Sequence, residues 1–186
     1  GFELSNGQCK LRSMYQMYDS LQDAGVGGLK TGLPAYRDGF SPQQIDLGRY
    51  LFFDPVLSGD GTVSCASCHN PSRGFSDGRG QSVGAKGQTV NRSAQSLWNV
   101  AFGQHFFWDA RAATLEEQMR GPLYDPREMA NNPEQLLRTL NDIPLYRELF
   151  RQAWPKDFKA EDATIRLEQV ETAIAAFQSS LISLNS

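Results

Sequence analysis

Hydrophobic residues in the second half of the chain recur every three to five positions, the spacing that places side chains on one face of a helix. The clearest example is residues 162–183, in which one stripe consists of Ile165, Val170, Ile174, Phe177 and Leu181. Three shorter segments, 114–120, 133–141 and 144–153, have the same pattern. We predict a helix in each of these segments.

Two further helices are predicted earlier in the chain. Ser41 followed by Pro42 is typical of a helix cap and first helical position, and apolar residues then recur through a predicted helix at 42–53. Residues 8–22 are predicted to form a short amphipathic helix that ends before the glycine-rich connector 25–32. Without an internal repeat or an alternating strand pattern, the expected fold class is all-α with long loops.

Residues 54–110 have no sustained period and are rich in glycine, serine, asparagine and aspartate. Aromatic side chains are nevertheless spread along them: Phe75, Trp98, Phe102, Phe106, Phe107 and Trp108. Because loops alone bury apolar area poorly, this composition favours loops that surround a bound group. The alternative is an ordinary irregular core.

Composition excludes several classes of partner. The formal net charge of −3 and the pI near 5.4 provide no basic surface for nucleic acid. No apolar run approaches the roughly 20 residues that a membrane-spanning helix needs.

The chain starts at Gly1 without a basic and then apolar leader, and we interpret it as a mature, processed product. We expect one domain at 41–186, preceded by an extension at 1–40.

The sequence VSCASCHNP, residues 63–71, contains two of the three cysteines and one of the two histidines. Cys-x-x-Cys-His is the attachment motif of c-type haem, in which Cys65 and Cys68 form thioethers and His69 is the proximal iron ligand. A zinc site would need a fourth ligand from Cys9, His105 or a carboxylate. A dithiol redox centre is the other alternative. Because c-type haem is generally attached outside the bacterial cytoplasm, we expect a periplasmic protein.

The sixth iron position separates an electron carrier from an enzyme, since a carrier fills it with histidine or methionine. His105 is predicted to pack near Phe106 and Phe107 rather than to ligate the iron. The four methionines, Met14, Met17, Met119 and Met129, are predicted to be packing residues.

Two longer stretches carry a family resemblance. LGRYLFFDPVLSGDGTVSCASCHNPSRGFSDGR (47–79) and FFWDARAATLEEQMRGPLYDPREM (106–129) strongly resemble the bacterial dihaem cytochrome c peroxidase and MauG family. The similarity covers about 40–183 and corresponds to the first, peroxidatic haem half of those proteins. The second Cys-x-x-Cys-His of the family is absent from this sequence.

The resemblance implies a cytochrome c-like haem domain and assigns roles to individual residues. Trp108 would relay electrons between two haems, while Gln118, Pro122 and Glu128 would surround the open face of the first haem. A carboxylate in a poorly solvated pocket can take a proton from one peroxide oxygen and return it to the other, which makes Glu128 the candidate acid and base. Without the resemblance, we would interpret Glu128 as a solvated residue in a turn, Gln118 as a surface residue and Trp108 as a core residue.

Two residues depart from the family pattern. Many of these peroxidases have a histidine that ligates the resting iron where this chain has Ala85, so the iron is expected to stay open at rest. Ser93 replaces an asparagine that helps to hold an interdomain calcium ion in the family, which makes calcium doubtful.

These observations predict a periplasmic haem c peroxidase that reduces hydrogen peroxide with electrons from a donor protein. The alternatives are MauG-like oxidation of residues on a partner protein and a non-enzymatic electron-transfer cytochrome. Because a relay tryptophan needs a source of electrons, we expect a second haem on a partner chain or on a missing half. Residues 1–40, with Cys9, are a candidate clasp for that partner through a disulfide.

Overall fold

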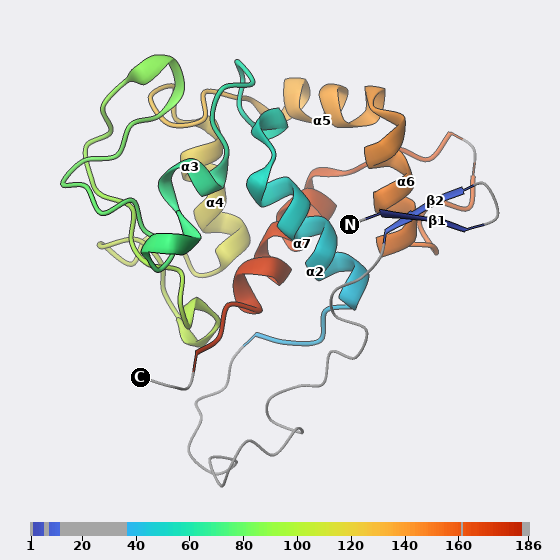
Figure 1. Ribbon diagram of the computed structural model, residues 1–186, viewed down its shortest axis with the longest axis horizontal. Coiled ribbons are helices and arrows are strands. Elements are labelled where there is room, and N and C mark those ends of the chain that lie inside the picture. The colour runs from blue at the N-terminus through green and yellow to red at the C-terminus, as the bar shows by residue number, and fades with distance from the viewer. Residues whose placement is uncertain (1, 6–7, 12–36, 161, 184–186) are drawn as a thin grey trace, which may run out of the picture.

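The computed structural model describes residues 2–5, 8–11, 37–160 and 162–183. Helices joined by long loops make up almost all of this part of the chain, which confirms the predicted all-α class (Figure 1). The α-helices are α2 (Pro42–Phe53), α3 (Cys65–Cys68), α4 (Leu115–Tyr124), α5 (Pro133–Asp142), α6 (Pro144–Ala153) and α7 (Leu167–Ser179). Single 3-10 turns are η2 (Pro55–Leu57), η3 (Pro71–Arg73), η4 (Ala85–Gly87) and η5 (Val100–Phe102).

The predicted helix at 8–22 is wrong over its described residues. Strands β1 (Phe2–Ser5) and β2 (Gln8–Leu11) form an antiparallel pair in which Ser5 is opposite Gln8, and this pair lies beside α6 (Figure 1). The strands flank Asn6-Gly7, a dipeptide that strongly favours two-residue hairpin turns, and this was the signal for a hairpin. Residues 12–22 and the predicted connector 25–32 lie outside the described residues.

Helix α2 matches its prediction at both ends. The Ser41 hydroxyl accepts from the Gln44 N–H at 3.2 Å, and the Gln44 side chain accepts from the Ser41 N–H at 3.0 Å. This reciprocal pair satisfies two amide groups that the helix start leaves open. The face formed by Ile45, Leu51 and Phe52 is fully buried.

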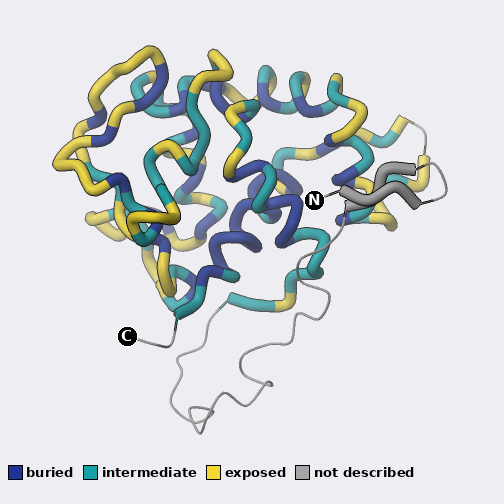
Figure 2. The backbone as a smooth tube through the Cα atoms, viewed as in Figure 1, coloured by how far each residue is buried: buried dark blue, intermediate teal, exposed yellow. Residues whose placement is uncertain are grey.

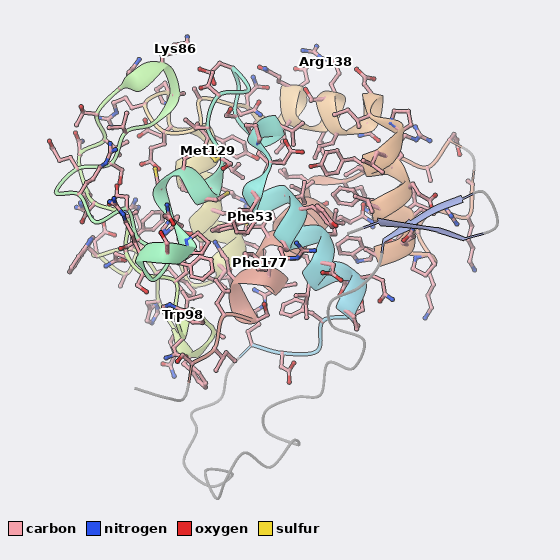
Figure 3. All side chains as sticks on the ribbon, in the orientation of Figure 1. Phe53, Lys86, Trp98, Met129, Arg138 and Phe177 are labelled. Carbon is pink, nitrogen blue, oxygen red and sulfur yellow. The ribbon has the colours of Figure 1, made fainter. Side chains whose placement is uncertain are left out.

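Helix α7 is the centre of the core and packs against α2 and α4 (Figure 2). Phe177 lies where α7 meets α2, with its ring centroid 6.1 Å from that of Phe53 (Figure 3). The predicted stripe is buried along its whole length, but the helix is shorter than the predicted 162–183. Ile165 lies before the helix, and its N–H donates to the Asn141 side chain on α5 at 2.9 Å rather than within a helix turn. At the other end, the Asn99 N–H donates to the carbonyl of Leu181 at 2.8 Å.

The loops between α2 and α4 contribute only scattered core residues. Leu57, Phe75, Ala85 and Leu97 are buried there, while much of the surrounding chain is exposed (Figure 2). Among the described helices, none has the length and apolar character needed to span a bilayer.

Candidate functional site

Residues Cys65–Cys68 of the Cys-x-x-Cys-His motif form the single turn of α3, and His69 of the motif directly follows this turn. The His69 N–H donates to the carbonyl oxygen of Cys65 at 2.8 Å and closes this turn. Helical residues three positions apart lie on one face, so both thiols can reach the same bound group. Neither Cys65 nor Cys68 is in a disulfide, and both line a cavity.

Two backbone carbonyl groups orient the imidazole of His69. Its Nδ1 lies 2.9 Å from the carbonyl oxygen of Phe75 and 3.0 Å from that of Gln95. Because both carbonyls can only accept, Nδ1 carries the proton and Nε2 keeps a lone pair for a metal. Burial lowers the pKa of His69, against the effect of the two hydrogen bonds, so the ring is neutral at pH 7. The donor set therefore fits a haem held by two thioethers and one neutral imidazole.

The two other uses of such a motif fit this geometry less well. Burial raises the pKa of the Cys65 thiol to about 12, and burial also raises the pKa of Cys68. A dithiol redox centre needs the opposite shift, because the thiolate is its reactive form. In the described part of the chain, no three or more histidine, cysteine or acidic side chains are gathered so that they could hold a metal ion such as zinc.

The cavity beside the motif has a volume of about 660 Å³. Sites for small molecules and cofactors usually enclose about 300–1,000 Å³. A cavity of this size favours the prediction that the loops surround a bound group over the alternative of an ordinary irregular core. Its walls come from the motif, the loops that follow, α4, the turn after α4, and α7. The predicted residues that line it are Cys65, Cys68, His69, Ser93, His105, Trp108, Gln118, Pro122 and Glu128.

Glu128 lies in the turn after α4 and is half-buried rather than solvated. Its N–H donates to the carbonyl oxygen of Asp125 at 3.0 Å, which fixes the turn. Burial raises the pKa of Glu128, and the negative charge of Asp125 raises it further, while Arg127 and Arg111 oppose the shift. A carboxyl with a raised pKa at a cavity wall is suited to exchanging protons with a ligand.

Gln118 and Pro122 lie four positions apart on α4 and line the same cavity, so Gln118 is not a plain surface residue. The predicted helix 114–120 is too short, because α4 continues through Pro122 to Tyr124. Proline has no N–H, so the Gln118 carbonyl cannot receive the usual helical hydrogen bond from position 122. The last turn is held instead by the Asp125 N–H, which donates to the Gly121 carbonyl at 2.9 Å.

Trp108 lies at the edge of the cavity in the loop before α4. The expectation from the sequence alone that it is core is wrong, since 69% of the residue is exposed. The neighbouring Phe107 ring is covered by the Arg111 guanidinium, 3.4 Å from the ring centroid. Trp108 thus lines the cavity while most of the residue is exposed.

Residues considered for the sixth iron position differ in their surroundings. His105 is exposed at the cavity wall. Met119 and Met129 also line the cavity, but both are buried members of the hydrophobic core, which agrees with packing roles. Met14 and Met17 lie outside the described residues. Ala85 is buried, and its side chain has no atom that could ligate a metal.

Sequence reasoning missed the backbone groups and arginines of the site. The carbonyls of Phe75 and Gln95 orient His69, yet any residue type supplies a carbonyl, so no pattern points to them. Arg111 and Arg127 affect Glu128 electrostatically. Arg127 is next to Glu128 in the sequence, which was a signal, whereas Arg111 precedes Glu128 by 17 positions and had none.

The sequence is similar to those of known proteins over most of its length. The family model described as di-haem cytochrome c peroxidase matches residues 42–186. The methylamine utilization protein MauG of Methylorubrum extorquens is 41% identical over 143 residues, which cover 77% of this chain and 39% of that protein. The cytochrome c551 peroxidase of Pseudomonas aeruginosa is 38% identical over 146 residues, covering 78% of this chain and 41% of that protein.

Solved structures show the same likeness. A MauG-like protein associated with microbial copper homeostasis superposes with a TM-score of 0.74 at 33% sequence identity, covering 83% of this chain and 46% of that chain. The diheme peroxidase BthA of Burkholderia thailandensis gives a TM-score of 0.65 at 30% identity, over 78% of this chain and 40% of that one. The chain thus spans about two-fifths of the length of the curated relatives it matches. On these matches, the chain belongs to the di-haem cytochrome c peroxidase family.

Proposed function

We propose that this chain is the peroxide-reducing haem c domain of a periplasmic peroxidase. The observation that carries the proposal is that one cavity is lined by Cys65, Cys68 and His69 of the attachment motif and by the half-buried Glu128. When bound, haem c would be held by Cys65, Cys68 and His69 and would supply a redox-active iron for the reduction of peroxide. At position 85, where the resemblance implies a ligating histidine in many relatives, Ala85 has no ligating atom, which supports access of peroxide to the iron.

The side chains of the cavity have distinct tasks in this proposal. Glu128 would accept a proton from one oxygen of peroxide and return it to the other, departing oxygen. Gln118 donates a hydrogen bond to peroxide or to water, and Pro122 shapes the wall without adding a donor. The overall reaction consumes one hydrogen peroxide, two protons and two electrons and yields two waters. The electrons come from a donor protein or a second haem through Trp108.

Replacement of the Glu128 carboxyl tests this function. Glu128→Gln keeps the size of the side chain but cannot accept a proton, so the second-order rate constant for peroxide is expected to fall by about 10²-fold or more. The measurement is stopped-flow absorbance of the haem-loaded protein mixed with peroxide. Glu134→Gln, on the exposed surface of α5, is the matched control and is expected to react like the wild type. A near-normal rate for Glu128→Gln would refute the role.

A second candidate function is oxidation of residues on a partner protein, as the resemblance to MauG suggests. The exposure of Trp108 at the cavity edge favours it, because oxidising equivalents could leave through that side chain. The two functions use the same cavity and differ in where the oxidising equivalents go: to an electron-donor protein in the first and to residues of a partner protein in the second. An electron-carrying cytochrome is the non-enzymatic alternative, and it would neither bind cyanide nor react with peroxide.

Localisation and haem content are also part of the proposal. Covalent haem attachment supports a periplasmic site, and a second haem is expected on a partner chain or a further domain. Cell fractionation followed by native mass spectrometry of the purified material tests both points. Recovery from the cytoplasm, or a functional complex with one haem in total, would contradict them.

A further inference from the structure

The segment that carries Glu128 is held on one side by the loop at Gly84. The Ala85 N–H donates to the carbonyl oxygen of Glu128 at 2.6 Å. A Cβ atom on Gly84 would overlap the carbonyl oxygen of Arg127 and lie 2.7 Å from the Cα atom of Glu128. The two backbones therefore touch directly, with no room for a side chain between them.

The same segment is held on its other side by the loop at Gly59. The Gly59 N–H donates to the carbonyl oxygen of Met129 at 2.8 Å. A Cβ atom on Gly59 would overlap the carbonyl oxygen of Ala130 and lie 2.8 Å from the carbonyl carbon of that residue. Two loops thus approach residues 127–131 at backbone distance.

Both loops belong to the stretch of chain that carries the haem-attachment motif. Gly59 precedes Cys65 by six positions, and Gly84 follows His69 by fifteen. The Sγ atom of Cys68 also lies 3.7 Å from the carbonyl oxygen of Val83, next to Gly84. In Figure 3, Lys86 marks the outer end of this second loop and Met129 lies further inside. The attachment site and the Glu128 segment are therefore fixed to each other by backbone contacts.

We infer that Gly59 and Gly84 are positioning residues that set the distance between the haem-attachment motif and the carboxyl of Glu128. Only residues without a side chain at positions 59 and 84 let the two loops approach residues 127–131 this closely. A misplacement of about 1 Å at a catalytic group can cost about 10²-fold in rate, so this contact has consequences for turnover. The catalytic part of the inference rests on the proposed function of Glu128, whereas the contact itself does not.

Gly84→Ala and Gly80→Ala form a matched pair for the test. Both residues are in the loop region after the motif, and neither has the left-handed backbone that alanine would strain. A Cβ atom on Gly80 meets nothing within 4 Å, so the two variants differ in the space around the new methyl group. Gly59→Ala tests the same segment from its other side.

The first measurement is amide hydrogen exchange of the haem-loaded full chain, followed by mass spectrometry of peptides that contain residues 59 and 85, whose N–H groups donate to the carbonyl oxygens of Met129 and Glu128. Gly59→Ala is expected to speed exchange of the N–H at position 59, and Gly84→Ala that of the Ala85 N–H, at least tenfold, because the added methyl group strains or breaks the hydrogen bond. Gly80→Ala is expected to leave exchange unchanged. Unaltered exchange in both test variants, with covalent haem and helical content retained, would overturn the inference.

The second measurement is a double-mutant cycle on the peroxide rate constant. Gly84→Ala alone is expected to lower the rate constant by about 10²-fold. In a protein that already carries Glu128→Gln, it is expected to lower the rate constant little further, because both changes act through one carboxyl. Additive losses would show that Gly84 does not act through Glu128 and would overturn the positioning role. If Glu128→Gln alone has no effect, the proposed function fails, and the exchange experiment still decides whether the contact exists.

Discussion

At the scale of single residues, the site depends on which atom of each side chain is left free. His69 uses Nδ1 to donate to two backbone carbonyls, which leaves Nε2 as the ligand atom. Glu128 is half-buried in a turn whose other charged groups are Asp125 and Arg127. The sequence identifies both residues as candidates, but the groups around them determine their protonation states.

The raised pKa of Glu128 predicts how the peroxide reaction depends on pH. The protonated carboxyl cannot accept a proton, so the rate constant is expected to fall as the pH drops through the pKa of Glu128, with a midpoint above the ordinary value of 4.5. Asp125→Asn removes the nearby negative charge that helps to raise this pKa. The variant is therefore expected to move the midpoint to lower pH, as measured by stopped flow between about pH 4 and 8.

Arg127 and Arg111 lower the pKa of Glu128, so neither accounts for the raised value. A midpoint at or below 4.5, or one that Asp125→Asn leaves in place, would contradict the assignment of this acid limb to Glu128.

At the scale of helices, α4 carries Gln118 and Pro122 and is fixed to α7 by an ion pair. The Nε and terminal nitrogen atoms of Arg120 lie 2.6 and 2.8 Å from the two carboxylate oxygens of Glu171. The Glu171 side chain is 1% exposed, whereas that of Arg120 is 51% exposed. Arg120 thus provides the positive charge that balances the buried carboxylate of Glu171.

Arg120→Met tests the importance of this pair for stability. It leaves a buried carboxylate without its cation, and the free energy of unfolding is expected to fall by about 2–3 kcal/mol, less than for a fully buried pair because Arg120 is half in solvent. Arg151→Met, which breaks an exposed pair with Glu148 within α6, is the control and is expected to cost about 0.5 kcal/mol or less. Urea unfolding followed by circular dichroism compares them. Equal losses would mean that the α4–α7 pair is no more than a surface contact.

At the scale of the whole molecule, the chain presents a cavity whose edge includes an exposed tryptophan. It corresponds to about two-fifths of its curated relatives, so a surface of this kind is where a further domain or partner is expected to bind.

Trp108→Phe separates the chemistry in the cavity from the supply of electrons. Because Glu128 is unchanged, the first reaction with peroxide is expected to proceed at a near-normal rate. Steady-state turnover with a donor is expected to fall by about tenfold or more, since phenylalanine is much harder to oxidise than tryptophan and passes electrons less readily. Stopped-flow and steady-state assays on one preparation provide both numbers. Unchanged steady-state turnover would count against the relay.

Sequence patterns predicted most helices because the signals that set them are local. The cap at Ser41 and the apolar stripe through Ile174 and Phe177 lie within single elements, and α2 and α6 have their predicted bounds. Two errors have different causes. A distant contact ends the predicted helix 162–183 early, because the Ile165 N–H donates to Asn141 of α5. At 8–11, where β2 pairs with β1, the helix prediction missed a signal for a hairpin that was itself local, the Asn6-Gly7 dipeptide.

The sequence by itself determined the chemistry: two thiols and an imidazole at the spacing of haem attachment, and a resemblance that named Glu128, Gln118 and Trp108. Only the tertiary structure decided how those groups are presented. It showed that Phe75 and Gln95 orient His69, that Trp108 is exposed, and that two glycine loops enclose the segment of Glu128. The physical reason is that residue identity fixes which atoms can bind or transfer protons, whereas burial and backbone contacts between distant segments fix their direction, distance and charge.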